Sequence, residues 1–190
     1  MLTLQPRCLG ILCLSVLALA LTSCATTSSS SRSSNGIYMP ENFRADYTDR
    51  LPKQINTNGQ RVVVVDPSKY VWGAYGSDGE LIRAGVATSG GDWCPDDNAP
   101  CRTKVGTFRI SSLGSEDCKS RIYPRPEGGG LMPYCMFFSG GQALHGSPDI
   151  TVVENNVSHG CVRMRIQDAE WMRNSFASVG TKVIVRPYEN

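Results

Sequence analysis

Most apolar residues of this chain fall in short runs that predict β-strands. Residues 61–66 (Arg-Val-Val-Val-Val-Asp) form a β-branched run that is too short for a helix. Residues 69–75 and 80–88 flank the segment Gly-Ser-Asp-Gly at 76–79, which is typical of a hairpin turn. Four further runs are strand-like and are bounded by Gly, Pro or Ser: 106–111, 135–138, 143–145 and 181–186. The pattern therefore predicts a mainly β domain.

One segment has helical periodicity instead. Between residues 166 and 176, apolar residues recur at mixed three- and four-residue spacing, and Asp168 and Glu170 lie near its beginning. Gly180 follows, where the chain would leave the helix for the last strand. We expect one amphipathic helix whose two aromatic side chains pack into the core rather than contact a ligand.

Two segments carry no periodic pattern. Residues 112–132 are rich in Gly and Pro, and they are predicted either as a mobile lid or as a plain loop. Residues 36–60 contain scattered Pro and aromatic residues. We expect these to form an extension that packs along a domain spanning residues 61–187, and the pattern assigns them no chemistry.

The beginning of the chain has the pattern of an export signal. Residues 8–21 are an almost unbroken apolar run, shorter than the roughly 20 residues that a membrane span needs. An internal core helix is the alternative, and it is disfavoured because nothing amphipathic or capped follows the run. The small residues before Cys24 resemble a bacterial lipobox, which implies a signal peptide over residues 1–23 and lipidation of Cys24.

The resemblance to a lipobox also implies a location. Ala25, the residue after Cys24, resembles the signal that sorts lipoproteins to the outer membrane. We therefore expect a protein of the bacterial cell envelope, held at the periplasmic face of a membrane through the lipid anchor on Cys24. Residues 24–35 are rich in Ser and Thr and lack large apolar side chains. Because such a segment cannot bury enough apolar surface to fold, we expect a flexible tether.

Composition narrows the class of protein. The chain has 190 residues, of which 41% are hydrophobic and 19% charged, enough for one domain with a buried core. It contains 19 Lys and Arg against 17 Asp and Glu, and the basic residues do not cluster. We therefore expect no nucleic-acid partner.

An odd number of cysteines would remain in the mature chain, in a compartment where disulfides form. Loss of the two in the apolar run and lipidation of Cys24 leave five: Cys94, Cys101, Cys118, Cys135 and Cys161. Four cysteines permit three connectivities, and we favour Cys94 with Cys101, which closes a short loop rich in Pro and Asp, and Cys118 with Cys135. Cys161 is then unpaired, either as a small buried hydrophobic residue or as a reactive thiol.

Both histidines of the chain lie close to Cys161 in sequence. His145-Gly146-Ser147 is followed by Ser158-His159-Gly160-Cys161-Val162-Arg163-Met164. A thiol with the ordinary pKa of about 8.5 is a poor nucleophile at neutral pH, so we expect a neighbouring imidazole to hold Cys161 as a thiolate. Gly160 permits a sharp turn whose backbone N–H groups can bind an oxyanion.

These residues resemble a known family. A His followed at a distance by Ser/Thr-His-Gly-Cys is the signature of the L,D-transpeptidase catalytic domain, also called the YkuD domain. Four more segments resemble its earlier strands and its approach to the active site: 85–90, 104–108, 132–134 and 143–146. The resemblance covers residues 61–186 and implies a mainly β fold, a sandwich or barrel with one helix after the active-site turn.

The resemblance also implies residue roles. Cys161 would be the nucleophile, His145 the general base and acid, and the Gly146 carbonyl the acceptor that orients the imidazole. His159 would help to shape the turn rather than take the thiol proton. The N–H groups around Gly160 and Cys161 would form the oxyanion hole.

Three further residues complete the predicted site. Ser158 belongs to the same turn as the nucleophile. Tyr134 would line the acyl-donor groove, and Arg163 would pair with a substrate carboxylate through its planar guanidinium. The resemblance implies neither a metal nor another cofactor.

The implied reaction is acyl transfer on peptidoglycan stem peptides. Cys161 would attack the carbonyl at the L-centre of diaminopimelate in a tetrapeptide stem, expel D-Ala and form a thioester. An amine of another stem would then resolve the thioester. Water can replace that amine, so a hydrolytic carboxypeptidase or endopeptidase activity is an alternative that uses the same site.

The chain departs from the family pattern in two ways. The cysteine-bearing insertions at 92–102 and 116–135 are not part of the minimal pattern, and Arg163 stands where many members carry Asn. Both departures leave the predicted nucleophile and base in place. They bear on substrate range, because we expect the insertions to border the groove.

Two alternative functions compete with this assignment. His145, His159 and Cys161 could supply three zinc ligands with water as the fourth, but a Gly-flanked Cys beside His without a carboxylate fits nucleophilic catalysis at least as well. A non-catalytic lipoprotein that tethers the membrane to the wall is the alternative from another class. Its signature would be a broken His/Cys pair, and here the pair is intact.

Overall fold

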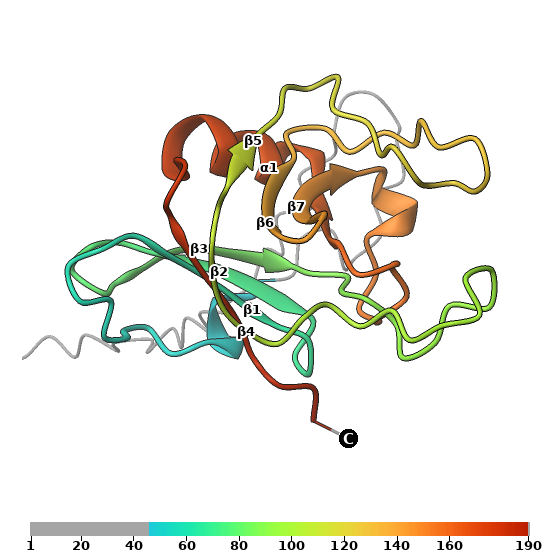
Figure 1. Ribbon diagram of the computed structural model, residues 1–190. Coiled ribbons are helices and arrows are strands. Elements are labelled where there is room, and N and C mark those ends of the chain that lie inside the picture. Colours follow the sequence, from blue (N-terminus) through green and yellow to red (C-terminus); the bar gives the residue numbers. More distant parts are fainter. Residues whose placement is uncertain (1–45, 190) are drawn as a thin grey trace, which may run out of the picture. The chain divides into compact units, whose positions relative to one another are not determined.

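The computed structural model describes residues 46–189, which form two mixed β-sheets (Figure 1). The first sheet has the strand order β3-β2-β1-β9-β4 and the second has the order β5-β6-β7-β8. The strands of sheet one are β1 (Val62–Asp66), β2 (Val71–Tyr75), β3 (Leu81–Val86), β4 (Gly106–Arg109) and β9 (Lys182–Val185). Those of sheet two are β5 (Ser112–Leu113), β6 (Met136–Ser139), β7 (Gln142–Ser147) and β8 (Val162–Arg165).

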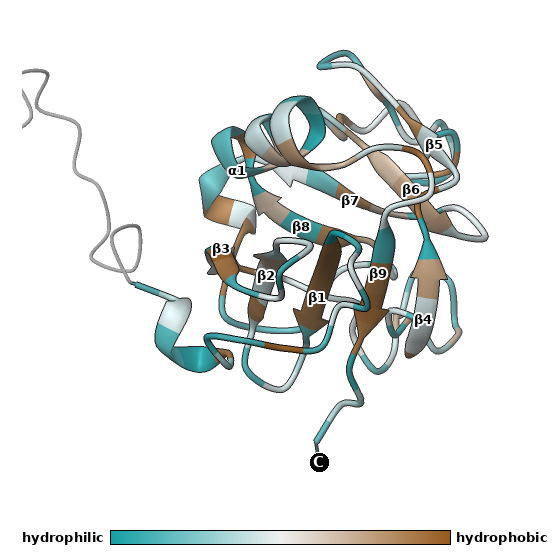
Figure 2. Ribbon diagram, turned by 90° about the vertical axis from the view of Figure 1, so that its left-hand side faces the viewer, coloured by the Kyte–Doolittle hydropathy of each residue, from teal (hydrophilic) through white to brown (hydrophobic). Residues whose placement is uncertain are grey.

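Sheet one is covered on both faces, which explains the continuous apolar run of its central strand. Val63 and Val65 of β1 face the main core, whereas Val62 and Val64 belong to a second cluster on the outer face. Strands that are buried on both faces carry unbroken runs of Val and Ile rather than alternating patterns. In Figure 2, β1 and the neighbouring β9 are accordingly among the most hydrophobic elements.

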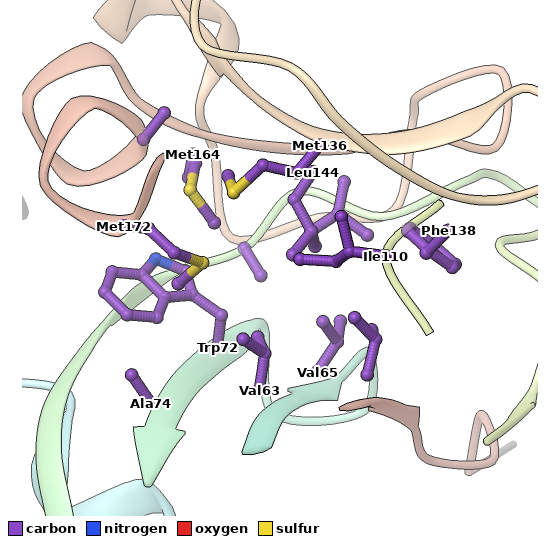
Figure 3. Packing of buried hydrophobic residues seen from close by; sticks show 14 of the residues in the cluster. Val63, Val65, Trp72, Ala74, Ile110, Met136, Phe138, Leu144, Met164 and Met172 are labelled. Atoms are coloured by element: carbon purple, nitrogen blue, oxygen red, sulfur yellow. The ribbon is translucent and has the colours of Figure 1, made fainter. Parts of the chain in front are cut away.

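The main core lies between the two sheets. Figure 3 shows Met136, Leu144 and Met164 of sheet two pointing toward Val63 and Trp72 of sheet one. All five side chains are fully buried. Burial of such side chains contributes roughly 1.5–3 kcal/mol each, so this layer supplies much of the stability that holds the sheets together.

Each of the seven regions predicted as strands contains a strand, and two strands were not predicted. β8 follows the active-site motif and alternates Val and Met with two arginines, so its buried positions repeat with the period of a strand. β5 is only two residues long and exists because it pairs with β6. The 76–79 turn closes the predicted hairpin, with Gly79 at φ +89°.

The predicted helix is present but changes its winding halfway. α1 (Ile166–Trp171) is an α-helix, and Met172–Phe176 (η4) continues it as a π-helix. The N–H of Ala177 donates to the Met172 carbonyl at 2.7 Å, five residues back. The wider turn lets Met172 and Phe176 both enter the main core, and the Trp171 ring packs against it, as expected from the sequence.

The segment before β1 packs against the outer face of sheet one. It begins with a short 3-10 helix, η2 (Thr48–Arg50), and Tyr47 and Leu51 join the outer cluster. Gln54 then forms a β-bridge with Glu80. No helix within residues 46–189 is long and apolar enough to span a membrane. The predicted signal peptide (1–23), the lipid anchor at Cys24 and the tether (24–35) lie outside the described residues.

Candidate active site

The connection between two parallel strands brings the predicted base and nucleophile together. β7 and β8 pair in parallel, with Leu144 opposite Val162 and His145 opposite Arg163. Parallel neighbours cannot be joined by a tight turn and need a crossover of a dozen or more residues. Here residues 148–161 form that crossover, which contains the short helix η3 (Asp149–Thr151) and ends at Cys161, directly before β8.

The strand register places His145 and Cys161 on the same face of sheet two. Leu144 and Val162 point into the main core, so the residues on either side of them point to the opposite face. Cys161 packs against Ala143 on that face. His145 and Cys161 are therefore diagonal neighbours on two adjacent parallel strands.

The His145 imidazole is held in one orientation. Its side chain is buried, and Nδ1 lies 2.8 Å from the carbonyl oxygen of Gly146. Because a carbonyl only accepts hydrogen bonds, Nδ1 carries the proton and Nε2 is left unprotonated. This is the orientation predicted from the sequence, and it leaves Nε2 able to accept a proton.

Gly146 also has a packing role that the sequence did not show. Its N–H donates to the Pro133 carbonyl at 2.8 Å, and a Cβ atom here would lie 3.0 Å from the Ile166 Cα atom. The close approach of α1 to β7 therefore leaves no room for a side chain at this position.

Cys161 is the free cysteine of the described chain. Its half-buried thiol packs against the cluster of Met132, Cys135 and Ala143, and Sγ lies 3.9 Å from the Gly141 carbonyl oxygen. Burial raises the pKa of the Cys161 thiol, and a backbone hydrogen bond from Ala143 and the charge of Arg163 act in the opposite direction with less effect.

The resting charge state differs from the predicted one. Burial lowers the pKa of His145 to about 4, although the hydrogen bond to Gly146 partly opposes the shift. A raised thiol pKa and a lowered imidazole pKa both favour the neutral forms of the two groups at neutral pH. Both shifts act against the thiolate and charged imidazole that the sequence led us to expect, because burial of the two groups was not visible in the motif.

The turn before Cys161 is built around a hydroxyl group. Ser158 Oγ donates to the Cys161 carbonyl and accepts from the Gly160 N–H at 3.2 Å. Gly160 has φ +107°, a conformation that L side chains rarely adopt, and Thr103 Oγ1 donates to its carbonyl at 2.9 Å. Ser158 is thus the residue that closes the turn.

This bonding bears on the predicted oxyanion hole. The Gly160 N–H is engaged by Ser158, so its predicted role as an oxyanion donor conflicts with its role in closing the turn. The N–H of Cys161 is the remaining donor of the predicted pair. Its role in binding an oxyanion stays a prediction.

Comparison with known proteins decides the family. The family model described as the L,D-transpeptidase catalytic domain, YkuD, matches residues 60–185. The chain belongs to this family.

Solved structures agree with this assignment at the level of the fold. An L,D-transpeptidase of Xylanimonas cellulosilytica is 25% identical with a TM-score of 0.59, and the match covers 70% of this chain and 63% of that one. An L,D-transpeptidase from Mycobacterium smegmatis is 25% identical with a TM-score of 0.54, and the match covers 67% and 59% of the two chains. This chain thus spans about three fifths of the structures that it matches. No curated protein sequence matches it.

Both insertions of this L,D-transpeptidase domain carry a disulfide. Cys94 and Cys101 are joined with a Cα–Cα distance of 5.8 Å, and Cys118 and Cys135 with one of 6.1 Å. Both distances lie within the usual range for disulfides. The pairing is the one that the sequence favoured, and it leaves Cys161 unbonded.

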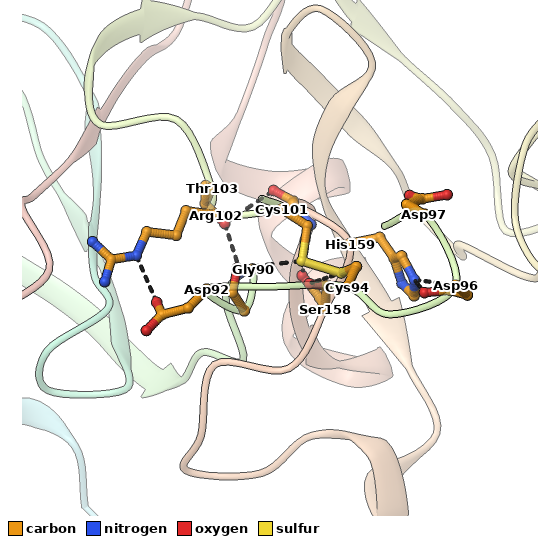
Figure 4. The surroundings of a disulfide bond; sticks show 12 residues. Gly90, Asp92, Cys94, Asp96, Asp97, Cys101, Arg102, Thr103, Ser158 and His159 are labelled. Atoms are coloured by element: carbon orange, nitrogen blue, oxygen red, sulfur yellow. Dashed lines mark hydrogen bonds and ion pairs between the residues drawn. A yellow bond between two sulfur atoms is a disulfide. The ribbon is translucent and has the colours of Figure 1, made fainter. Parts of the chain in front are cut away.

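His159 lies where the two insertions of the domain meet. Its Nε2 is 2.7 Å from a carboxylate oxygen of Asp96 in the first insertion. The ring of Tyr123, from the second insertion, packs against the imidazole with centroids 4.3 Å apart. Figure 4 shows His159 and Asp96 on one side of the Cys94–Cys101 bond.

The insertions also contact each other directly. The Tyr123 hydroxyl donates to Asp97, and Arg125 forms an ion pair with the same carboxylate. The stretch predicted as a lid or loop is therefore fastened to the first insertion at this point. These contacts were not predictable from the sequence, because they join segments whose relative placement depends on the rest of the fold.

Two predicted substrate residues lie in different surroundings. Arg163 is half-buried beside His145, and its charge lowers the pKa of both His145 and Cys161. Tyr134 instead packs against the main core, with its hydroxyl 3.4 Å from Glu116. These contacts give no support for Tyr134 in the acyl-donor groove, and that role stays a prediction.

The alternative zinc site is not assembled. Within residues 46–189, the one gathering of three potential ligand atoms within 4.8 Å joins Cys94, Asp96 and His159, not the predicted set of His145, His159 and Cys161. Cys94 is in a disulfide, so its sulfur is not a thiolate ligand. His159 turns toward Asp96 because the first insertion supplies a carboxylate that the motif alone does not contain.

The buried imidazole predicts a pH dependence of stability. His145 titrates near pH 6.5 in the unfolded chain and at about pH 4 in the folded one, so the unfolded state binds more protons between these values. The free energy of unfolding should then fall as the pH drops from 7 to 4, by about 3 kcal/mol from this group. Urea unfolding of the wild type and of His145→Gln at both pH values measures the effect. An equal pH dependence in the two proteins would contradict it.

The backbone conformation of Gly160 predicts that a side chain at this position destabilises the fold. An Ala at Gly160 adopts a strained φ and places Cβ 2.5 Å from Gln142 Nε2, whose amide group bonds to the Arg102 carbonyl and the Lys104 N–H. We expect Gly160→Ala to lower the free energy of unfolding by about 1–3 kcal/mol and to change the rate at which iodoacetamide alkylates Cys161. Gly140→Ala is the matched control, because Gly140 also has positive φ but nothing within 4 Å of the added atom. The same alkylation rate in Gly160→Ala and wild type would show that the turn does not set the thiol's environment.

Proposed function

We propose that this chain is an L,D-transpeptidase that acts on peptidoglycan stem peptides through Cys161. One observation carries the proposal: an unbonded thiol and an imidazole with a free Nε2 share one face of two adjacent strands, within a domain of this family. A nucleophile, a base beside it and a group that orients the base are the parts that covalent acyl transfer needs.

The first half of the reaction forms a thioester. The Cys161 sulfur attacks the carbonyl at the L-centre of diaminopimelate in a tetrapeptide stem, while His145 Nε2 takes the thiol proton. The bond from this carbonyl carbon to the D-Ala nitrogen then breaks, and the imidazolium gives its proton to the departing amine. Because the resting pair is neutral, proton transfer accompanies attack rather than preceding it.

The second half regenerates the thiol. An amine of another stem attacks the thioester carbon, and His145 Nε2 takes a proton from that amine. The carbon–sulfur bond breaks, and the imidazolium returns the proton to the Cys161 sulfur. The Gly146 carbonyl holds the imidazole in place through both halves, because Nδ1 keeps its hydrogen bond throughout.

Arg163 is placed to bind an anionic group of the stem. Its side chain is half-buried and has no ion pair or hydrogen bond within the part of the chain that the structure describes. Burial lowers the pKa of the Arg163 guanidinium, and a partly desolvated cation gains most from an anionic partner. The stem peptide carries carboxylates of the kind that an Arg side chain binds with two parallel hydrogen bonds.

The decisive test uses stem peptides of defined structure. The purified chain incubated with tetrapeptide-bearing muropeptides should release D-Ala and yield cross-linked dimers, read as product masses. Cys161→Ala should lose all turnover, because the thioester cannot form. Ile150→Ala is the control, since Ile150 is 89% exposed and lies outside the site.

The same experiment distinguishes the alternatives. Shortened monomers without dimers would mean that water resolves the thioester, as in a carboxypeptidase. Full turnover by Cys161→Ala would refute the role of the thiol. Binding of wild-type protein to peptidoglycan without any product would favour a non-catalytic tether.

We further propose that the protein is an envelope lipoprotein with lipid on Cys24, held at the outer membrane with its domain in the periplasm. The apolar run of residues 8–21 and the small residues before Cys24 support this location, and the two disulfides suit an oxidising compartment.

The proposed location predicts the state of every cysteine in the mature chain. Mass mapping of protein purified from membranes should find lipid on Cys24, bridges in the two insertions and a free thiol only at Cys161. Cys24→Ala should leave the membrane fraction but keep both bridges, because the anchor and the domain are separate segments. An unmodified Cys24, or a bridge that includes Cys161, would contradict the proposal.

A further inference from the structure

A groove beside the active-site turn has no role in the chemistry derived above. It encloses about 670 Å³ and lies between the first insertion, the end of the crossover and the last described residues. This volume falls within the range of roughly 300–1,000 Å³ that small-ligand sites occupy. His159 lines it, and two residues of chain span at most about 7 Å, so the groove begins close to Cys161.

The groove has exposed apolar side chains and a wall that is held in place by hydrogen bonds. Trp93 is 53% exposed and Val157 is 48% exposed, and both line it. Tyr188 forms part of the wall, where its hydroxyl donates to the Gly90 carbonyl and accepts from the Thr103 N–H, each at 2.9 Å. The Arg102 guanidinium covers one face of the Tyr188 ring at 4.7 Å from its centroid. These bonds hold the wall in place before any ligand arrives.

One polar atom of a lining residue lacks a partner. Asn156 Nδ2 donates to the Pro67 carbonyl at 3.1 Å, whereas its Oδ1 is buried and has no hydrogen-bond partner within residues 46–189. An unsatisfied buried acceptor costs about 1–3 kcal/mol. Because this oxygen is buried, a ligand in the groove does not reach it, and the ligand would find its polar partners among the exposed lining side chains.

The charges around the groove favour a ligand without carboxylates. Its lining includes three acidic residues, Asp92, Asp96 and Glu189. The lining Arg102 is bound to Asp92 at 2.6 Å and His159 to Asp96 at 2.7 Å, so neither is left to bind a carboxylate of a ligand. In Figure 4 this pair lies on the opposite side of the Cys94–Cys101 bond from His159 and Asp96. A stem peptide, which bears several carboxylates, would be repelled here.

We infer that the groove binds the N-acetylated sugar residues of the glycan strand that carries the stem peptide. A pyranose ring has an apolar C–H face that can stack on Trp93, and its edges bear hydroxyl and acetamido groups that can donate to the exposed Glu189 carboxylate. The sugars are mostly neutral, as the acidic lining requires. The inference rests on the proposed function, because it concerns another part of the same polymer.

Direct binding tests the groove without reference to catalysis. Chitotetraose, an uncharged oligomer of N-acetylglucosamine, is titrated calorimetrically into the full chain. Trp93→Ala should weaken binding about tenfold, since that ring supplies most of the stacking surface. Trp93→Phe should restore part of it, and Ile150→Ala, outside the groove, should bind as the wild type. No binding by the wild type, or equal binding by Trp93→Ala, would overturn the inference.

A kinetic comparison separates this inference from the proposed function. The wild type and Trp93→Ala are assayed on a free stem tetrapeptide and on the same stem attached to its disaccharide. Trp93→Ala should raise KM about tenfold for the disaccharide substrate only, with kcat unchanged. If both substrates were affected equally, the groove would be a peptide subsite and the inference would fail while the proposed function stood. If neither protein turned over either substrate, the proposed function would fail, and the chitotetraose titration would still decide the groove.

Discussion

The parallel, in-register pairing of β7 with β8 is the constraint on which the site depends. It fixes His145 opposite Arg163 and, through the alternation of strand side chains, puts Cys161 on the same face as the imidazole. A slip of one residue would move the thiol into the core and bring Leu144 or Val162 to the outside. The core therefore enforces the register, because Leu144 and Val162 are fully buried between the sheets.

Burial then determines how the pair works. A site exposed to water would allow a charged thiolate and imidazolium at rest, whereas here burial lowers the pKa of His145 and raises that of Cys161, which favours the neutral forms. Arg163 stands beside them as the nearby positive charge and favours the thiolate once the proton has moved. In the proposed reaction, the Cys161 sulfur would thus stay a thiol at rest and become an anion only as its bond to the substrate forms.

The sequence predicted those features that depend on local pattern. The Val run of β1, the hairpin at 76–79 and the helix beginning at Ile166 follow from composition and periodicity over a few residues. The Gly146 carbonyl as the hydrogen-bond partner of the His145 ring followed from the family motif. β8 is not evident from the sequence, because its two apolar residues, Val162 and Met164, form an alternating run too short to predict a strand.

Features that depend on the placement of distant segments were not predictable. His159 meets Asp96 and Tyr123 only because two insertions fold toward each other, and neither insertion has a periodic pattern. The direction of the Cys161 pKa shift depends on how the 132–135 segment covers the thiol. The residue types along the sequence predict which groups could react, but the solvent exposure of those groups depends on the assembled fold.

The contact between η2 and the crossover has a mechanical consequence. Tyr47 and Arg50 both bond to Glu154, and Val152 packs in the same cluster as Leu51. Glu154 lies in the connection that ends at the nucleophile. A force applied to the chain at Asp46 would thus be transmitted through Glu154 and Val152 to the connection that ends at Cys161.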